Sequence, residues 1–129
     1  MTEPTPTPSA RIVVVDDDED SRDLFVAVLR INGFEADPFA AAEDALAAVL
    51  EHPPDAVLLD ITLAGNIDGY ELARRLRATG EPPKRILVAV TGHSASTVRS
   101  EGVRFDAVFT KPVDPDILVA ELRRLVGTR

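Results

Sequence analysis

The sequence predicts an α/β fold in which a parallel sheet carries helices on both faces. Short apolar runs rich in β-branched residues alternate five times with longer stretches whose apolar residues recur at helical spacing. Such alternation favours right-handed crossover connections, which make the strands parallel. The 129 residues suffice for about one domain with a single core, and no internal repeat is visible.

The expected strands and helices follow one another regularly along the chain. We expect strands at Ile12–Asp16, Phe34–Phe39, Ala56–Asp60, Arg85–Thr91 and Phe105–Thr110. We expect helices at Asp20–Asn32, Ala40–His52, Asp68–Thr79, Ser94–Glu101 and Asp114–Val126. Residues 1–10, "MTEPTPTPSA", are too poor in apolar side chains to offset the entropy of ordering them. We therefore predict a disordered tail over 1–10 and one folded domain over 11–129.

The order of the strands follows from how each one is patterned. The runs "IVVV", "AVLL" and "ILVAV" are continuously apolar, as in central strands that are buried on both sides. The second strand carries Pro38 and the fifth carries Asp106, which fit the edges of a sheet. The order 2-1-3-4-5 places both at edges and corresponds to a flavodoxin-like, doubly wound (βα)5 fold.

Polar residues stand where four of these strands end. The first strand leads into Asp16 and Asp17, the third ends in Asp60, the fourth ends in Thr91, and the fifth leads into Lys111. In an open parallel sheet, ligands bind beyond the carboxyl ends of the strands, where the strand order reverses. Three carboxylates without Cys or His form an all-oxygen site, which suits Mg²⁺ and a phosphoryl group. A lysine there can contact a phosphoryl oxygen.

Each of these residues also has a purely structural interpretation. Acidic residues after a strand often stabilise a helix N-terminus, and we expect this role for Asp18–Asp20. Taken alone, Asp60 could be a cap, Thr91 a turn hydroxyl and Lys111 a solvated loop charge. Their joint occurrence at appropriate strand ends favours a shared site.

The composition disfavours several classes of partner and location. The apolar runs fall far short of the roughly 20 residues that a membrane helix needs, and no signal peptide is recognisable. The chain has no Cys, which fits a reducing compartment. The net charge of -8 disfavours binding to nucleic acids and anionic membranes. We therefore expect a cytoplasmic protein whose partners are other proteins and cations.

Five motifs together resemble the receiver domain of two-component response regulators, in its stand-alone, CheY-like form. They are "IVVVDDDEDSR", "AVLLDITL", "IDGYELARRLR", "ILVAVTG" and "FTKPVD", and they occur in the family's order from Arg11 to Val126. The resemblance implies a signalling function in which a sensor histidine kinase or a phosphotransfer protein phosphorylates this chain. It implies no enzyme beyond catalysis of its own phosphorylation and slow dephosphorylation, and a monomer or weak homodimer that acts on a downstream protein.

The resemblance also implies a role for each residue at the strand ends. Asp60 would be the phosphoacceptor, Thr91 the switch hydroxyl and Lys111 the phosphate-contacting lysine. The Mg²⁺ ligands would be Asp16, Asp17, Asp60 and the backbone carbonyl of Thr62. The output surface would be formed by helix four, strand five and helix five, and would include Arg99, Val108, Arg123 and Arg124.

The sequence departs from the family pattern at two places. Ala64 stands where the family usually has Pro, and Gly69 lies nine residues past Asp60 where eight is usual, so the loop has one extra residue. Val108 stands where many members carry an aromatic residue that rotates on activation. Phe109 is adjacent, but alternation along a strand points it to the opposite face. We therefore expect no aromatic relay.

Two other functions are compatible with parts of this pattern. One is a receiver-like module that binds a partner without being phosphorylated, which Val108 and the altered loop favour. The other is a metal-dependent phosphatase with Asp60 as nucleophile. A general acid two residues after the nucleophile is expected in the haloacid-dehalogenase-like pattern, and Thr62 occupies that position here.

Overall fold

The computed structural model of the protein describes residues 10–63, 67–79, 85–92, 98 and 102–127. The predicted disordered tail therefore lies outside the described residues, apart from Ala10. The predicted helix Ser94–Glu101 also lies outside them, apart from Val98. No helix in the described part of the chain combines the length and the apolar character needed to cross a bilayer.

Five parallel strands form one sheet in the predicted order. They are β1 (Arg11–Val15), β2 (Glu35–Phe39), β3 (Ala56–Asp60), β4 (Ile86–Thr91) and β5 (Ala107–Thr110), arranged as β2-β1-β3-β4-β5. Every residue of β3 and β4 is buried, whereas the two edge strands are partly exposed. The flavodoxin-like fold is confirmed. As predicted, the two edge strands are β2, which contains Pro38, and β5, which follows Asp106.

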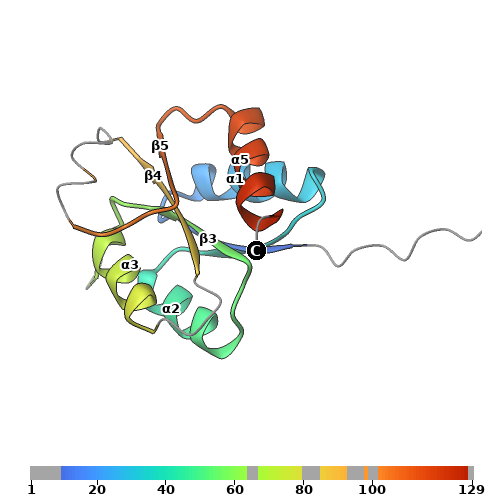
Figure 1. The fold of residues 1–129 in the computed structure, drawn as a ribbon. Coiled ribbons are helices and arrows are strands. Elements are labelled where there is room, and N and C mark those ends of the chain that lie inside the picture. The colour runs from blue at the N-terminus through green and yellow to red at the C-terminus, as the bar shows by residue number, and fades with distance from the viewer. Residues whose placement is uncertain (1–9, 64–66, 80–84, 93–97, 99–101, 128–129) are drawn as a thin grey trace, which may run out of the picture.

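The described helices cover both faces of the sheet (Figure 1). They are α1 (Glu19–Ile31), α2 (Ala42–Glu51), α3 (Gly69–Ala78) and α5 (Pro115–Gly127). One apolar cluster joins α1 and α5 to one face through Leu29, Leu118 and Leu122, and the other joins α2 and α3 to the opposite face through Val49 and Leu72. The two faces alternate along each strand, so the site at the strand ends rests on a core packed from both sides.

Capping side chains mark the starts of α1 and α3. Asp18 is the N-cap of α1 and accepts a hydrogen bond from the Ser21 amide, which confirms the structural role predicted for Asp18–Asp20. Asp68 caps α3 in the same way by accepting from the Glu71 amide. The extra residue of the preceding loop does not displace the predicted start of α3, which begins directly after Asp68.

Several predicted ends were wrong by one or two residues. The helix predicted from Ala40 begins at Ala42, because the backbone of its N-cap residue, Ala41, is extended, with φ -117° and ψ 139°. The strand predicted from Phe105 begins at Ala107. The reason is that the Asp106 carboxylate accepts the Leu87 amide at 2.7 Å, a bond that a strand carbonyl would otherwise form.

Arg77 ties the last turn of α3 to the entry of β4 and β5. Its guanidinium donates to the carbonyl oxygen of Arg85 at 2.5 Å, to that of Arg104 at 2.8 and 3.0 Å, and to Asp106 Oδ2 at 3.1 Å. Hydrogen bonds from a charged donor contribute roughly 1.5–3 kcal/mol when they are protected from water. Because Arg77 is 25% exposed, water can replace part of this contribution.

We expect Arg77→Ala to lower the free energy of unfolding by about 1–3 kcal/mol, measured by urea denaturation. The matched control is Arg75→Ala on the same helix. Arg75 is half-exposed and pairs with Glu71 at 3.6 Å, an interaction that contributes about 0.5 kcal/mol or less. An equal loss of stability in both variants would contradict a specific role for Arg77.

Candidate acidic site at the carboxyl edge of the sheet

Three carboxylates gather where the strand order reverses. Asp16 and Asp17 follow β1, Asp60 ends β3, and β1 and β3 are neighbours in the sheet. One oxygen from each carboxylate lies within 4.8 Å of the others. Asp16 and Asp60 are 1% and 4% exposed, while Asp17 is exposed. The sequence predicted this convergence.

Hydrogen bonds hold Asp16 in place, but one of its two carboxylate oxygens has no hydrogen-bond donor among the described residues. Its Oδ1 accepts from the Asp18 amide at 2.9 Å, and its carbonyl oxygen accepts from Arg22 Nη1 at 3.0 Å. Its Oδ2 is buried without a hydrogen-bond donor among the described residues, 3.7 Å from Lys111 Nζ. Burial raises the pKa of Asp16, although the Asp18 amide and the Lys111 charge oppose the rise. A second cation would relieve the cost of burying this oxygen.

Both oxygens of Asp60 have fixed partners. Its Oδ1 accepts from the amide of Thr62 at 2.9 Å and from the Thr62 hydroxyl at 2.8 Å. Its Oδ2 accepts from Lys111 Nζ at 3.1 Å. These three bonds fix the plane of the carboxylate, and Oδ2 faces the cation rather than the backbone.

Lys111 is positioned by the last contacts between β4 and β5. Its amide donates to the carbonyl oxygen of Thr91 at 2.8 Å, which extends the pairing of the two strands by one residue. Burial alone would lower the pKa of the Lys111 ammonium, but its hydrogen bond to Asp60 and the charge of Asp16 outweigh burial and raise this pKa. The side chain is therefore a stable cation beside Asp60.

Thr91 and Thr62 occupy different positions relative to the cluster. Thr91 is the last residue of β4 and is fully buried. The residue before it, Val90, pairs in register with Asp60 on β3. The Thr62 side chain bonds Asp60, and the ligand role of its carbonyl stays a prediction. Val108 packs with the α2 and α3 face of the core and Phe109 with the α1 and α5 face, which confirms their predicted opposite orientations.

Sequence reasoning missed two groups that shape the site. The Thr62 hydroxyl fixes Asp60, and the Arg22 guanidinium holds the backbone of Asp16. A hydroxyl residue two positions after an Asp is a known signal for local turn bonding, so the first could have been found. The contact of Arg22 could not have been predicted, because the sequence does not determine the direction in which an arginine side chain in the first turns of a helix extends.

The donors present fit a divalent cation. Mg²⁺ and Ca²⁺ prefer carboxylate oxygens, and three such oxygens converge here without a nitrogen or sulfur ligand. The buried Oδ2 of Asp16 has the character expected of a ligand atom that awaits a cation. The charge of Lys111 alone compensates only part of the three negative charges.

Comparison with known proteins identifies the class to which this fold and site correspond. The family model of the response regulator receiver domain matches residues 12–123. The chain belongs to the response regulator receiver domain family. Receiver domains are signalling domains of two-component systems rather than ordinary enzymes, and this chain is one of them.

Individual relatives agree with this assignment. The DNA-binding response regulator MtrA of Mycolicibacterium smegmatis is 39% identical over 113 residues, which cover 88% of this chain and 49% of MtrA. A CheY-like receiver domain protein from Methanospirillum hungatei has a TM-score of 0.82 at 28% identity, covering 93% of this chain and 95% of that one. CheY4 of Vibrio cholerae, at 23% identity, a TM-score of 0.82 and coverage of 91% and 98%, shows the same fold. The chain spans about half the length of the curated relatives it matches.

Proposed function

We propose that Asp60 accepts a phosphoryl group from the phosphohistidine of a sensor kinase or phosphotransfer protein. The observation that carries this proposal is the environment of Asp60 Oδ2, a buried carboxylate oxygen 3.1 Å from Lys111 Nζ and grouped with Asp16 and Asp17. A nucleophile of this kind needs positioning and neutralisation of charge more than it needs a base. The bonds from Thr62 support the positioning, and the ammonium of Lys111 supports part of the charge neutralisation.

The transfer exchanges one bond to phosphorus for another. An oxygen of Asp60 attacks the phosphorus atom, the bond from phosphorus to the histidine nitrogen breaks, and the imidazole leaves with that electron pair. Thr62 keeps the attacking carboxylate in one orientation, and Lys111 binds an oxygen of the incoming group. Asp16, Asp17, Asp60 and the carbonyl of Thr62 would hold Mg²⁺, which supplies charge neutralisation for the phosphoryl oxygens when it is bound.

Intact mass spectrometry tests this proposal directly. The chain is incubated with acetyl phosphate and Mg²⁺, and we expect a mass gain of one phosphoryl group. The gain should disappear when the metal is removed with EDTA. An absence of labelling under all conditions would favour the alternative that Val108 supports, a receiver-like interaction module that is not phosphorylated.

We expect Mg²⁺ at millimolar concentration to raise the melting temperature. The physical reason is that three carboxylates repel one another, and an ion that binds only the folded chain stabilises it by mass action, by about 1.4 kcal/mol at ten times its Kd. Differential scanning fluorimetry with and without Mg²⁺ measures the shift. Asp17→Asn should reduce the shift strongly, because it removes one ligand charge without disturbing a buried residue. A shift that persists undiminished in this variant would argue against the site.

Phosphorylation would change a surface of the chain to which a downstream protein binds. Relatives such as MtrA are named DNA-binding response regulators, but the net charge of this chain is -8, so we assign no nucleic-acid contact to it. The proposed output surface combines β5, α5 and residues 94–101, and Thr91 and Lys111 would couple it to the phosphoryl group. Such coupling typically amounts to about 1–3 kcal/mol.

Binding of beryllium fluoride with Mg²⁺, which imitates the phosphoryl group, is expected to shift amide NMR signals mainly within residues 91–112. Thr91→Ala should diminish the shifts in β5, because it removes the buried hydroxyl at the end of β4 that would couple the phosphoryl group to β5. The proposed coupling fails if the shifts concentrate in α2 instead, or if Thr91→Ala leaves the β5 shifts unchanged.

A further inference from the structure

Arg22 lies one helical turn from the acidic residues that follow β1. It is half-buried, and its amide donates to the carbonyl oxygen of Asp18 at 2.9 Å in the first turn of α1. The capping bond between Asp18 and the Ser21 amide fixes the start of this helix. The base of the Arg22 side chain therefore has a fixed position beside the acidic site, and its guanidinium donates from Nη1 to the carbonyl oxygen of Asp16 at 3.0 Å.

The carbonyl that Arg22 holds lies where β1 leaves the sheet. The last residue of β1, Val15, pairs with Leu59 of β3 and with Phe39 of β2. The Asp16 amide still donates to the Phe39 carbonyl oxygen at 3.1 Å, whereas the Asp16 carbonyl oxygen accepts from the side chain of Arg22. At this point a contact with α1 therefore takes over from the pairing of the strands.

The bond to this carbonyl orients two of the three converging carboxylates. The carbonyl of Asp16 and the amide of Asp17 belong to one planar peptide group. Holding that plane restricts the backbone rotations on both sides of it, and these rotations set the directions of the two side chains. The bond from the Asp18 amide to Asp16 Oδ1, 2.9 Å long, depends on the same stretch of backbone. Arg22 therefore acts on the carboxylates through the backbone.

The charge of Arg22 by itself would disfavour a metal ion. Like charges repel, so a guanidinium beside a cation site weakens binding of the cation unless it has another effect. The acidic cluster already has one cation, Lys111, which lies 3.1 Å from Asp60 and 3.7 Å from Asp16. Orientation of the peptide is an effect of Arg22 that favours the ion. The two effects have opposite signs, so an experiment can separate them.

We propose that Arg22 is a positioning residue of the acidic site, and that it holds the Asp16–Asp17 peptide in the orientation in which both carboxylates bind Mg²⁺. Groups that orient the ligands of a metal without binding it contribute strongly to affinity, and their loss typically weakens binding roughly 10–100-fold. The inference rests on the proposed function only in taking the carboxylate cluster as a Mg²⁺ site. It requires neither a phosphodonor nor phosphoryl transfer to Asp60.

Titration of the unphosphorylated chain with Mg²⁺ tests the proposal, with the amide NMR signals of residues 16–18 reporting the bound fraction. We expect Arg22→Gln to weaken Mg²⁺ binding about tenfold, because the shorter side chain cannot reach the Asp16 carbonyl. Arg22→Lys retains the charge and a donor of nearly the same reach, so its loss of affinity should be smaller. Unchanged or tighter binding in Arg22→Gln would show that only the charge acts, and would overturn the proposal.

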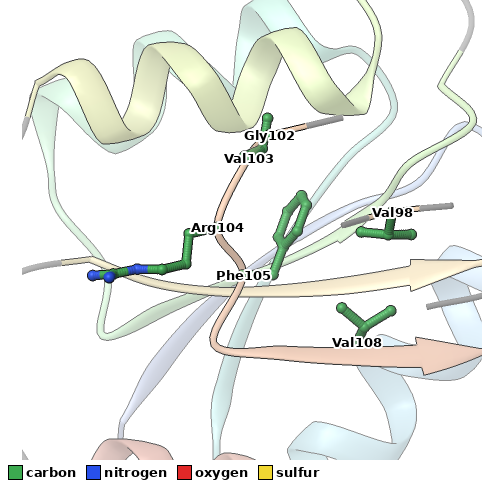
Figure 2. Close-up of a pocket in the computed structure, with 6 residues that line it drawn as sticks. All are labelled: Val98, Gly102, Val103, Arg104, Phe105 and Val108. Atoms are coloured by element: carbon green, nitrogen blue, oxygen red, sulfur yellow. The ribbon is translucent and has the colours of Figure 1, made fainter. Parts of the chain in front are cut away.

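Two other arginines provide matched controls. Arg30 lies in the last turn of α1 and donates from Nη2 to the Ala36 carbonyl oxygen at 2.9 Å, so Arg30→Gln removes the same kind of bond from the same helix. Arg104 is exposed, and its side chain points away from the apolar cavity beside it (Figure 2), so Arg104→Gln changes the charge alone. Both variants should bind Mg²⁺ as the unmodified chain does. A loss of affinity in either that equals the loss in Arg22→Gln would overturn the proposal.

The unmodified chain offers a test that does not depend on the folding of a variant. If the bond between Arg22 and Asp16 strengthens Mg²⁺ binding, Mg²⁺ must strengthen this bond by the same factor. Exchange of the Arg22 guanidinium protons with water, measured by NMR, should therefore slow several-fold when Mg²⁺ is added. Exchange at Arg30, at the other end of α1, should not change. The same rate with and without Mg²⁺ at Arg22, or equal slowing at Arg30, would overturn the proposal.

The outcomes for Arg22 and for the proposed function are distinguishable. If acetyl phosphate does not phosphorylate the unmodified chain but Arg22→Gln weakens Mg²⁺ binding, only the phosphoacceptor role of Asp60 fails. If the unmodified chain is phosphorylated but Arg22→Gln binds Mg²⁺ normally, only the positioning role of Arg22 fails. An unmodified chain that binds no Mg²⁺ would overturn the role of Arg22 together with the metal site.

Discussion

Asp60→Asn is expected to abolish phosphoryl incorporation from acetyl phosphate in the presence of Mg²⁺. Asn has the same shape, and its single oxygen can still accept from Thr62, but its NH2 group then faces Lys111 and it has no anionic oxygen to attack phosphorus. The substitution also removes one charge from the acidic cluster. Intact mass spectrometry should therefore detect the unmodified chain alone. Because Asp60 is buried, the melting curve of the variant must be recorded beside that of the unmodified protein.

The matched control for this experiment is Asp18→Asn. Asp18 belongs to the same acidic run, but it caps α1 and lies outside the group of converging carboxylates. Asn caps helices about as well as Asp, so fold and labelling should both be retained. Phosphoryl incorporation into Asp60→Asn, or its loss in Asp18→Asn, would place the nucleophile elsewhere.

The strand order was predictable because burial on two faces leaves a distinctive pattern. Continuous apolar runs mark β1, β3 and β4 as central strands, and Pro38 excludes β2 from the interior of the sheet because proline cannot donate to a ladder. Once the order is known, parallel strands bring all their carboxyl ends to one edge. The proximity of Asp16, Asp60 and Lys111 follows from topology alone.

The ends of elements depend on contacts between distant residues and were less predictable. The start of β5 is determined by Asp106, which bonds the Leu87 amide and Arg77 on α3. A sequence window around Phe105 contains neither partner, so it suggests a longer strand. The same limitation explains why Arg22 was not assigned to the site, since its contact with the carbonyl of Asp16 depends on the orientation of α1.

Gly69→Ala is expected to destabilise the fold and to slow phosphoryl incorporation. A Cβ at this position would lie 2.6 Å from the carbonyl oxygen of Asp60, 2.6 Å from Ile61 Cα and 2.8 Å from the Ile61 carbonyl oxygen. All three are backbone atoms, so no side chain can rotate away, and α3 or the loop after Asp60 must shift. Overpacking of this kind costs about 1–3 kcal/mol, which urea denaturation can measure. The shift would also misplace the Asp60 carboxylate relative to Lys111.

Gly92→Ala is the matched control for this last prediction. Gly92 follows Thr91 at the same edge of the sheet, but an added Cβ there meets nothing within 4 Å. The same substitution should therefore leave stability unchanged or raise it by about 0.4–1 kcal/mol through loss of chain entropy in the unfolded state. If Gly69→Ala proves as stable and as readily phosphorylated as Gly92→Ala, the close approach of α3 to the Asp60 backbone does not constrain the site.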